Sequence, residues 1–218
     1  MGCGGSKAEQ PKNVTLHYFD LYARGEVIRM ALKYTGIAFI DDRISLDQWP
    51  AHDKTSYEFG KVPCLEIDNM KLVTTRAILR YICMRKNLYP KDRMQVWKIE
   101  SLCDFISDLF EPIAPLFIQN KTQEIKNYYE EKLLPGLQII EKRLKENKSE
   151  NHFVGNKTSM VDLVVFQFVH DFYVVDSRKS SFGSYLDKVP SLKKFVHNFI
   201  NSSGALKEYL DSREPRPF

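Results

Sequence analysis

The pattern of apolar and polar residues near the start of the chain predicts a strand, a helix and a second strand. Residues 14–19 are β-branched, aromatic and apolar, which is typical of a strand. Over residues 24–35, apolar side chains recur on one helical face, and Gly36 is a favourable helix stop. Residues 37–44 predict the second strand. We therefore expect a βαβ unit with parallel strands and a right-handed crossover.

The next segment predicts an antiparallel hairpin followed by a helix. Residues 62–67 are typical of a strand, Asp68 and Asn69 of a turn, and residues 70–73 of a returning strand. Residues 75–86 place apolar side chains at helical spacing. The order βαβ and then ββα is the thioredoxin-like arrangement, and it is complete by residue 86.

Beyond a polar, proline-containing linker at residues 87–92, the sequence predicts only helices. Apolar residues recur at helical spacing over residues 99–110 and 125–144, with a bend expected at Pro135. Residues 159–162 predict a capping box with Asp162 at helix position N3. This box opens an apolar helix over residues 163–175. The fold class is therefore α/β plus all-α. A flexible tail (1–13) precedes a thioredoxin-like domain (14–86), the linker and a helical bundle domain (93–218).

Composition and charge exclude several classes of protein. The chain has 218 residues, of which 43% are hydrophobic and 28% charged, as in ordinary globular proteins. Its net charge of +4 is spread along the chain without a basic block, so we expect no nucleic-acid partner. It contains neither an apolar run of about 18 residues nor the apolar core of a signal peptide. The four cysteines form no C-x-x-C motif and join no histidine cluster, which predicts a reduced, cytoplasmic protein without a metal site.

The first residues carry a lipidation pattern. Gly2 and Ser6 fit the N-myristoylation motif, and Cys3 is placed for palmitoylation. Two acyl chains would anchor the protein stably to the cytoplasmic face of a membrane, whereas one chain gives only marginal binding. The alternative is a flexible, glycine-rich tail without modification. The sequence leaves both interpretations open.

Several motifs, taken in their order and spacing, resemble the cytosolic glutathione S-transferases of the sigma-like class. The resemblance covers residues 14–218 and is carried by the segments 16–19, 24–29, 43–50, 59–68 and 154–162. It implies that the thioredoxin-like domain binds glutathione and that the helical domain carries a pocket for an electrophile. Glutathione would be a co-substrate, and no other cofactor is implied.

By this resemblance, the phenol of Tyr18 holds the glutathione sulfur as a reactive thiolate. A free thiol has a pKa near 8.5, so only about 3% is thiolate at pH 7. A charge-assisted hydrogen bond worth about 1.5–3 kcal/mol would lower the pKa of that thiol by about one to two units. Arg24 is implied to orient or polarise Tyr18. The alternatives are a tyrosine that only packs at a strand end and an arginine that is only solvated.

The resemblance implies further glutathione contacts in the loop and strand that follow. Trp49 and a lysine would hold the glycine carboxylate. Because this loop is one residue longer than the usual sigma pattern, both Lys54 and Lys61 are candidates for the lysine. Val62 would pair its backbone N–H and C=O with the cysteinyl backbone of glutathione, for which Pro63 should be cis. Otherwise these two residues simply begin a strand.

Two threonines are implied to bind the other end of glutathione. The hydroxyl of Thr75, together with N–H groups at a helix N-terminus, would hold the γ-glutamyl carboxylate. Thr74 stands where the family usually has Gln. It is shorter and lacks the amide, which predicts either lower affinity or a water-mediated contact. Thr75 could equally be an ordinary N-cap.

The resemblance also implies a homodimer and an electrophile pocket. Asp104 would reach the glutathione amino group of the neighbouring subunit, so that the twofold dimer shares its sites. The pocket would be formed by Phe19, Leu21, Tyr22, Phe105 and Asp108. The alternatives are a solvated Asp104 and apolar residues that belong to the core.

Three functions are compatible with this scaffold. They are conjugation of glutathione to small hydrophobic electrophiles, glutathione-dependent isomerisation of a prostaglandin endoperoxide to the D type, and a non-catalytic role as a ligand carrier or structural protein. Tyr18 and Arg24 favour catalysis, and among catalytic roles we expect the transferase. A glutaredoxin-type redox enzyme is excluded because it needs a cysteine near the start of the first helix, where residues 22–25 contain none.

Overall fold

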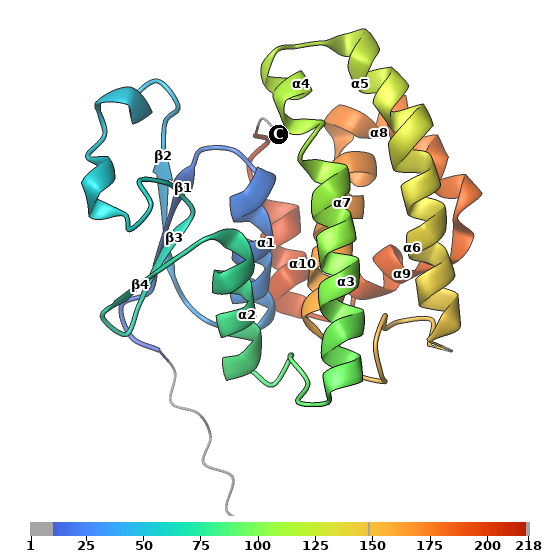
Figure 1. Cartoon of the computed structure of the whole chain (residues 1–218), viewed down its shortest axis with the longest axis horizontal. Coiled ribbons are helices and arrows are strands. Elements are labelled where there is room, and N and C mark those ends of the chain that lie inside the picture. Colours follow the sequence, from blue (N-terminus) through green and yellow to red (C-terminus); the bar gives the residue numbers. More distant parts are fainter. Residues whose placement is uncertain (1–10, 148, 217–218) are drawn as a thin grey trace, which may run out of the picture. The chain divides into compact units, whose positions relative to one another are not determined.

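The computed structural model describes residues 11–147 and 149–216, which belong to two compact units (Figure 1). The first unit ends at Asn87 and the second begins at Leu88. The fold class predicted from the sequence is confirmed, since a thioredoxin-like α/β unit precedes an all-helical one.

The first unit contains a mixed sheet with the strand order β2-β1-β3-β4. Strand β1 is parallel to β2 and antiparallel to β3, and β3 pairs antiparallel with β4. The elements are β1 (Thr15–Phe19), α1 (Ala23–Tyr34), β2 (Ile40–Ile44), the short 3₁₀ turns η1 (Trp49–Ala51) and η2 (Lys54–Ser56), β3 (Cys64–Ile67), β4 (Met70–Val73) and α2 (Thr75–Arg85).

Strand β2 begins three residues later than the sequence predicts, because the chain first closes helix α1. The N–H of Gly36 bonds the carbonyl of Lys33 at 3.1 Å, and the N–H of Ile37 bonds that of Leu32 at 2.9 Å. With Gly36 at a φ of 66°, these two bonds form a Schellman motif. The N–H of Ile37 is thus used by the helix end and not by the sheet.

The turn between β3 and β4 forms as predicted. Asp68 and Asn69 have φ values of 49° and 63°, and a two-residue hairpin turn of type I′ requires positive φ at both positions. Asp and Asn tolerate this conformation better than most residues.

The two faces of the sheet have different covers. Helices α1 and α2 lie on one face, and the segment that contains η1 and η2 lies on the other (Figure 1). Because side chains alternate along a strand, Leu16 and Tyr18 of β1 point towards the helices, whereas His17 and Phe19 point towards this segment. On that second side, Phe19 packs against a buried cluster of Ile44, Tyr57, Cys64 and Val73.

The second unit is built from helices throughout its described part. They are α3 (Arg93–Phe110), α4 (Ala114–Ile118), α5 (Thr122–Tyr128), the π-helical turn η3 (Tyr129–Leu133), α6 (Leu134–Glu146), α7 (Met160–Val169), the π-helical turn η4 (His170–Val174), α8 (Asp176–Phe182), the 3₁₀ turn η5 (Gly183–Lys188), α9 (Pro190–Ile200) and α10 (Gly204–Ser212). Every residue of α7 is buried, and α3 packs against it. Helix α7 is therefore the core of this unit.

Helix α7 opens with the predicted capping box. The backbone N–H and the hydroxyl of Ser159 donate to Oδ2 of Asp162 at 2.7 and 2.8 Å. The N–H of Phe153 donates to the other carboxylate oxygen at 2.8 Å. Although burial raises the pKa of Asp162 to about 6, these three donors satisfy the carboxylate when it ionises.

Pro135 marks a change of helix type. It stands in the first turn of α6, where a proline without an N–H is tolerated. The π-helical turn η3 leads into it. A proline prevents the regular α-helical bond to the fourth preceding carbonyl, so the chain adjusts its helical pitch over this turn.

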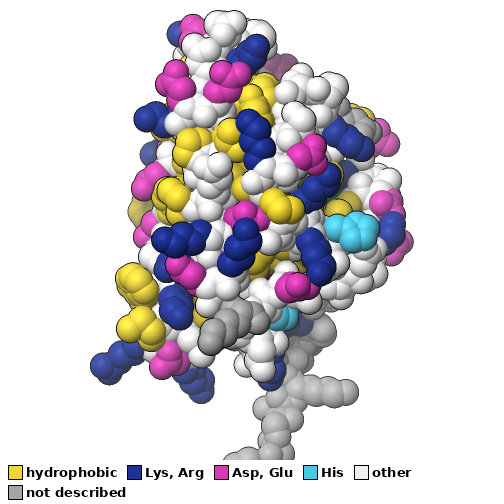
Figure 2. All heavy atoms as spheres, turned by 90° about the vertical axis from the view of Figure 1, so that its right-hand side faces the viewer, with side chains coloured by type: hydrophobic (Ala, Val, Ile, Leu, Met, Phe, Trp, Pro, Cys, Tyr) yellow, Lys and Arg dark blue, Asp and Glu magenta, His cyan; other side chains and the backbone are white. Residues whose placement is uncertain are grey.

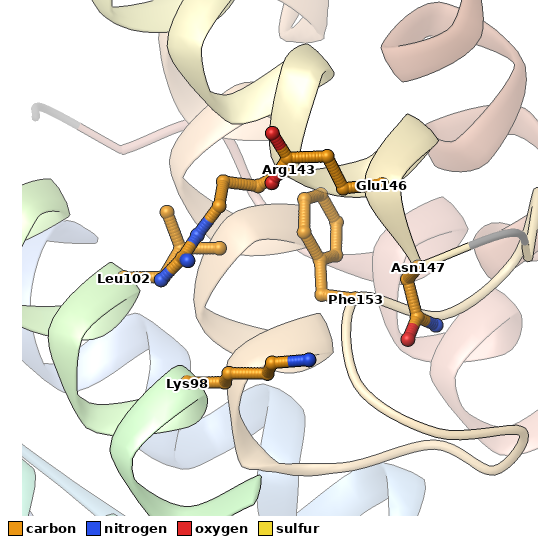
Figure 3. A pocket seen from close by; sticks show the side chains of 6 residues that line it. All are labelled: Lys98, Leu102, Arg143, Glu146, Asn147 and Phe153. Carbon is orange, nitrogen blue, oxygen red and sulfur yellow. The ribbon is translucent and has the colours of Figure 1, made fainter. Parts of the chain in front are cut away.

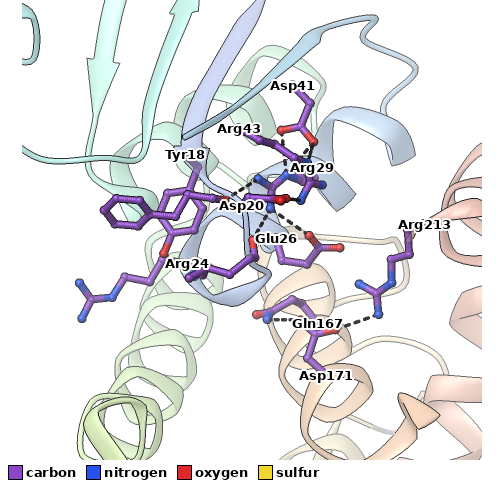
Figure 4. A network of polar contacts seen from close by, with 12 residues as sticks. Tyr18, Asp20, Arg24, Glu26, Arg29, Asp41, Arg43, Gln167, Asp171 and Arg213 are labelled. Carbon is purple, nitrogen blue, oxygen red and sulfur yellow. Dashed lines mark hydrogen bonds and ion pairs between the residues drawn. The ribbon is translucent and has the colours of Figure 1, made fainter. Parts of the chain in front are cut away.

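Arg29 of α1 is the central polar contact of the first unit (Figure 4). Its side chain is fully buried, and its Nε bonds both carboxylate oxygens of Asp41 on β2, at 2.9 and 3.0 Å. Its guanidinium also donates to Glu26 on α1 at 3.2 Å and to the backbone carbonyls of Leu21 and Phe19 at 2.9 and 3.3 Å. One side chain thus joins the helix to the end of β1 and to β2.

The described part of the chain contains neither a candidate membrane-spanning helix nor a disulfide. No helix within residues 11–147 and 149–216 is both long and apolar enough to span a bilayer. Cys64, Cys83 and Cys103 are buried thiols that form no disulfide with one another.

We predict that Arg29→Met lowers the free energy of unfolding by about 3–5 kcal/mol, because it leaves the buried carboxylate of Glu26 without this cation. The double variant Glu26→Leu/Arg29→Met should be more stable than the single one, since it removes both charges. As a control, Arg43→Met should cost about 1 kcal/mol or less, because Arg43 pairs with Asp41 and Asp20 near the surface. Urea unfolding measures all three, and equal losses for Arg29→Met and Arg43→Met would contradict the prediction.

Candidate functional site

Tyr18 lies near the carboxyl end of β1 and is 5% exposed. Its phenol oxygen accepts a hydrogen bond from the backbone N–H of Arg24 at 3.2 Å. This hydrogen bond thus comes from the main chain of Arg24, at the start of α1. The preceding residue, Ala23, has a φ of 34°. This region is uncommon for a residue other than glycine, and it belongs to the sharp turn that brings α1 back towards Tyr18.

Gly25 allows α1 to approach the ring of Tyr18. A Cβ atom at position 25 would lie 2.6 Å from Cγ of Tyr18 and would overlap the neighbouring ring carbon. Such distances are far inside van der Waals contact, which is ordinarily 3.4–4 Å. The close approach that places the Arg24 N–H against the phenol therefore requires a glycine at this position.

The peptide bond between Val62 and Pro63 is cis, as the sequence predicts. Val62 lies before the first residue of β3, and within the part of the chain that the structure describes, neither its N–H nor its C=O forms a backbone hydrogen bond. A backbone edge of this kind can pair with an extended peptide. This geometry suits the predicted pairing with the cysteinyl group of glutathione.

Thr74 and Thr75 form the turn into α2. Thr74 has a φ of 67°, which is a genuine outlier for a β-branched side chain. Residues held in such conformations cluster at binding and active sites. No side chain caps the N-terminus of α2 at Thr74, so the first N–H groups of this helix are available to an anion.

Trp49 and Lys54 are brought together in the loop that follows β2. The ammonium of Lys54 lies 5.5 Å from the centroid of the indole ring. The loop accommodates its length with the two 3₁₀ turns, one at each of these residues. Lys61, the other lysine candidate, is exposed, as Lys54 is. The observed contact with the Trp49 ring is that of Lys54.

The remaining predicted residues are distributed over both units. In the first unit, Leu21 and Tyr22 are buried between β1 and α1, and the ring of Phe19 packs edge-on against Trp49 with centroids 5.1 Å apart. In the second unit, α3 carries Asp104 and Asp108, which are exposed, and Phe105, which is partly buried. The electrophile pocket and the neighbouring-subunit contact stay predictions.

A hollow of about 320 Å³, counting its open mouth, lies in the second unit (Figure 3). Its walls come from α3, α6 and the segment before α7, and they are formed by Lys98, Leu102, Arg143, Glu146, Asn147 and Phe153. None of these residues is predicted from the sequence to bind a ligand. The hollow is thus not the predicted electrophile pocket.

Gly2 and Cys3, the candidate lipidation sites, lie outside the described residues. Among the described residues, no cluster of three or more His, Cys, Asp or Glu side chains could hold a metal ion.

Sequence reasoning missed three residues that shape this site. Gly25 and Arg29 belong to the segment 24–29, which carries the family resemblance. Their steric and electrostatic roles become visible only in the structure, where α1 lies against Tyr18. Tyr57 is buried under the Trp49 loop. Phe59, two residues further on, is aromatic too but 57% exposed, so aromatic character alone would not have identified Tyr57 as the buried residue.

We predict that Gly25→Ala lowers the free energy of unfolding by about 1–3 kcal/mol, the usual cost of overpacking, because the new methyl group meets the Tyr18 ring. The same substitution should cost less in a Tyr18→Ala background, where the ring is absent. Gly204→Ala is the matched control, since a Cβ there meets nothing within 4 Å. Urea unfolding measures each, and an equal cost in both backgrounds would contradict the steric explanation.

Comparison with known proteins assigns both units to the same protein family. Residues 14–83 match the family model described as "Glutathione S-transferase, N-terminal domain", and residues 107–213 match "Glutathione S-transferase, C-terminal domain". The "Glutathione S-transferase 2" of Onchocerca volvulus is 31% identical over 201 residues, which cover 91% of this chain and 92% of the relative.

Solved structures agree in fold. A "Pi-class Glutathione S-transferase" of Onchocerca volvulus superposes with a TM-score of 0.81 at 30% identity, covering 92% of this chain and 93% of the other. The "prostaglandin synthase D" of Nilaparvata lugens gives a TM-score of 0.79 at 22% identity over 93% of this chain and 99% of the other, a likeness in fold alone. With both of its units matched and a relative similar along nearly its whole length, the chain belongs to the glutathione S-transferase family.

Proposed function

We propose that this protein is a glutathione transferase of the sigma-like type, which joins the glutathione thiolate to small hydrophobic electrophiles. The observation that carries the proposal is the buried phenol of Tyr18, whose oxygen accepts the N–H of Arg24 at 3.2 Å. A donor on the phenol oxygen draws electron density from the O–H bond. This makes the phenol a stronger donor towards an anion.

The thiolate is the species that this donor stabilises. A hydrogen bond from the Tyr18 phenol to the sulfur favours the ionised thiol without any proton transfer from the tyrosine, in the manner of an oxyanion hole. The thiol proton leaves to solvent. The sulfur then forms a bond to the electrophilic carbon, and the leaving group departs with the electron pair of its bond.

The rest of the proposed site holds glutathione along its length. Trp49 and Lys54 take the glycine carboxylate, with Lys61 as the alternative lysine, and Val62 before cis-Pro63 pairs with the cysteinyl backbone. Thr75 and the N-terminus of α2 take the γ-glutamyl carboxylate.

Because Thr74 replaces the usual Gln, Thr74→Gln should lower the KM for glutathione, and an unchanged or raised KM would count against this role.

We predict that Tyr18→Phe lowers the rate of conjugation to 1-chloro-2,4-dinitrobenzene about 10- to 100-fold at pH 6.5, since about one to two pKa units of thiolate stabilisation are lost. In the wild type, the rate should follow an apparent pKa well below that of free glutathione. In the variant, this pKa should return towards about 8.5. Tyr34→Phe, on the last residue of α1, is the control.

Two other results would redirect the assignment. Activity that is indifferent to Tyr18 would overturn the thiolate mechanism. Glutathione binding without any conjugation would favour either the isomerase or a ligand carrier, and turnover of a prostaglandin endoperoxide to the D-type product would separate these two.

We further propose a homodimer in which Asp104 of one subunit contacts the glutathione amino group in the other. The exposed position of Asp104 on α3 is compatible with this role. Asp104→Asn should raise the KM for glutathione and leave kcat unchanged, whereas the exposed Asp187→Asn should change neither. Sedimentation of the wild type as a monomer at micromolar concentration would contradict the shared site.

Finally, we propose that this protein is cytoplasmic and is acylated on Gly2 and Cys3, on the basis of the sequence pattern alone. Metabolic labelling with alkyne analogues of myristate and palmitate should label the wild type. Gly2→Ala should lose both labels and the membrane-bound fraction, because palmitoylation of Cys3 would depend on the first attachment. Mass analysis of cell-derived protein that shows both residues unmodified would remove the proposal.

A further inference from the structure

Three aromatic side chains stack in the loop between β2 and β3. The ring of His52 lies 5.4 Å from that of Trp49 at an interplanar angle of 23°, and 5.6 Å from that of Tyr57 at 12°. Trp49 and Tyr57 are themselves 6.1 Å apart. In addition, Nε2 of His52 lies 3.0 Å from the phenol oxygen of Tyr57. His52 therefore contacts both other rings and is bonded to one of them.

Tyr57 is the anchor of this stack. It is the one buried residue between positions 45 and 61, all of which are described, and it packs with Ile44, Cys64 and Val73 on the sheet. Burial raises the pKa of its phenol. The phenol thus stays protonated, and its oxygen forms a hydrogen bond with Nε2 of His52 at 3.0 Å.

Besides this stack, the loop is held by hydrogen bonds within its own turns and by one from the Lys71 ammonium to the Ser56 carbonyl at 3.5 Å. Its two 3₁₀ turns are three residues long and contain no buried residue. Segments with few buried contacts open at low free-energy cost. The position of Trp49 consequently depends on side-chain contacts. These are the stack with His52 and Tyr57, the edge-on contact with Phe19 at 5.1 Å, and packing against the buried cluster that contains Tyr57.

We propose that His52 is a positioning residue for glutathione: bonded to the buried Tyr57 and stacked on Trp49, it holds the indole and the adjacent Lys54 in place for the glycine carboxylate. The inference rests on the proposed function, because it assigns a role to the same site. It adds a residue that the resemblance does not assign, in the loop that is longer than the usual pattern.

The geometry predicts a specific kinetic signature. His52 belongs to the loop on one face of the sheet, whereas Tyr18 points towards the helices on the other face. It should therefore affect how well glutathione binds and not how the thiol ionises. A side chain that must be ordered on binding costs affinity. His52→Ala should therefore raise the KM for glutathione about three- to tenfold and leave kcat and the apparent thiol pKa unchanged.

A spectroscopic readout can observe the stack directly. The chain has two tryptophans, so Trp97→Phe on α3 leaves Trp49 as the sole indole reporter. In that background, His52→Ala should shift the emission of Trp49 to longer wavelength and lower its anisotropy. His197→Ala, which changes an exposed histidine of α9, should affect neither the emission nor the KM.

Two further variants separate stacking from hydrogen bonding. His52→Phe keeps an aromatic ring without the bond, and Tyr57→Phe keeps the anchor ring without its hydroxyl. Each should raise the KM less than His52→Ala does. Because both remove the same bond, their combined effect should be smaller than the product of the two single effects.

The inference and the proposed function fail in different ways. A wild-type KM together with unchanged Trp49 emission in His52→Ala would overturn the positioning role, even if urea unfolding showed lower stability. A fall in kcat or a shifted thiol pKa would also overturn it. If instead the activity of the wild type proved independent of Tyr18, while His52→Ala still weakened glutathione binding, the thiolate mechanism would fail and the positioning role would stand.

Discussion

The buried guanidinium of Arg29 fixes the framework on which the site depends. Removing this charge from water costs several kcal/mol, and the cost is offset only if its donors are satisfied. Here two carboxylates and two backbone carbonyls accept them. The carbonyls belong to Phe19 and Leu21, one and three residues after Tyr18. The same interaction that makes burial tolerable therefore sets the path of the chain beside the phenol of Tyr18.

Arg29 also acts on Tyr18 more directly. Its guanidinium carbon lies 5.8 Å from the centroid of the Tyr18 ring, at the outer range of a cation–π contact. On another side, the ring meets Gly25 of the same helix. Helix α1 thus determines where the ring lies and supplies the N–H that bonds its oxygen. The position of the phenol follows from the packing of one helix, not from a flexible loop.

Sequence patterns predicted the order of elements, because this order depends on local signals, whereas the candidate site residues came from the family resemblance and stay predictions. The strand pattern of residues 14–19, the stop at Gly36 and the turn at Asp68 each reflect a preference of a few neighbouring residues. The cis peptide bond before Pro63 was expected from the family resemblance and not from a local signal. By contrast, the φ of 34° at Ala23 has no sequence signal, since alanine gives no sign of it. The burial of Tyr57 likewise results from contacts with residues distant in sequence.

The motifs and the comparison with solved structures point to different classes within the family. Class-defining motifs near Tyr18 resemble the sigma type, yet a pi-class structure matches with 30% identity over most of the chain. The main-chain features of the proposed site are the cis bond at Pro63, the strained turn at Thr74 and the uncapped start of α2, and their proposed role is to bind glutathione. They carry no information on the electrophile.

The chain thus separates two tasks by using two anchors. Arg29 orders α1 and the phenol, on the face of the sheet covered by helices. Tyr57 orders the Trp49 loop, on the opposite face. The two anchors meet at Phe19, whose carbonyl bonds Arg29 and whose ring packs against the cluster of Tyr57, and their other contacts are with different side chains. A change at one anchor should therefore disturb the other little. In the proposed mechanism, activation of the sulfur is then separable from binding of the glycine carboxylate, and the loop between β2 and β3 can vary with little effect on the geometry around Tyr18.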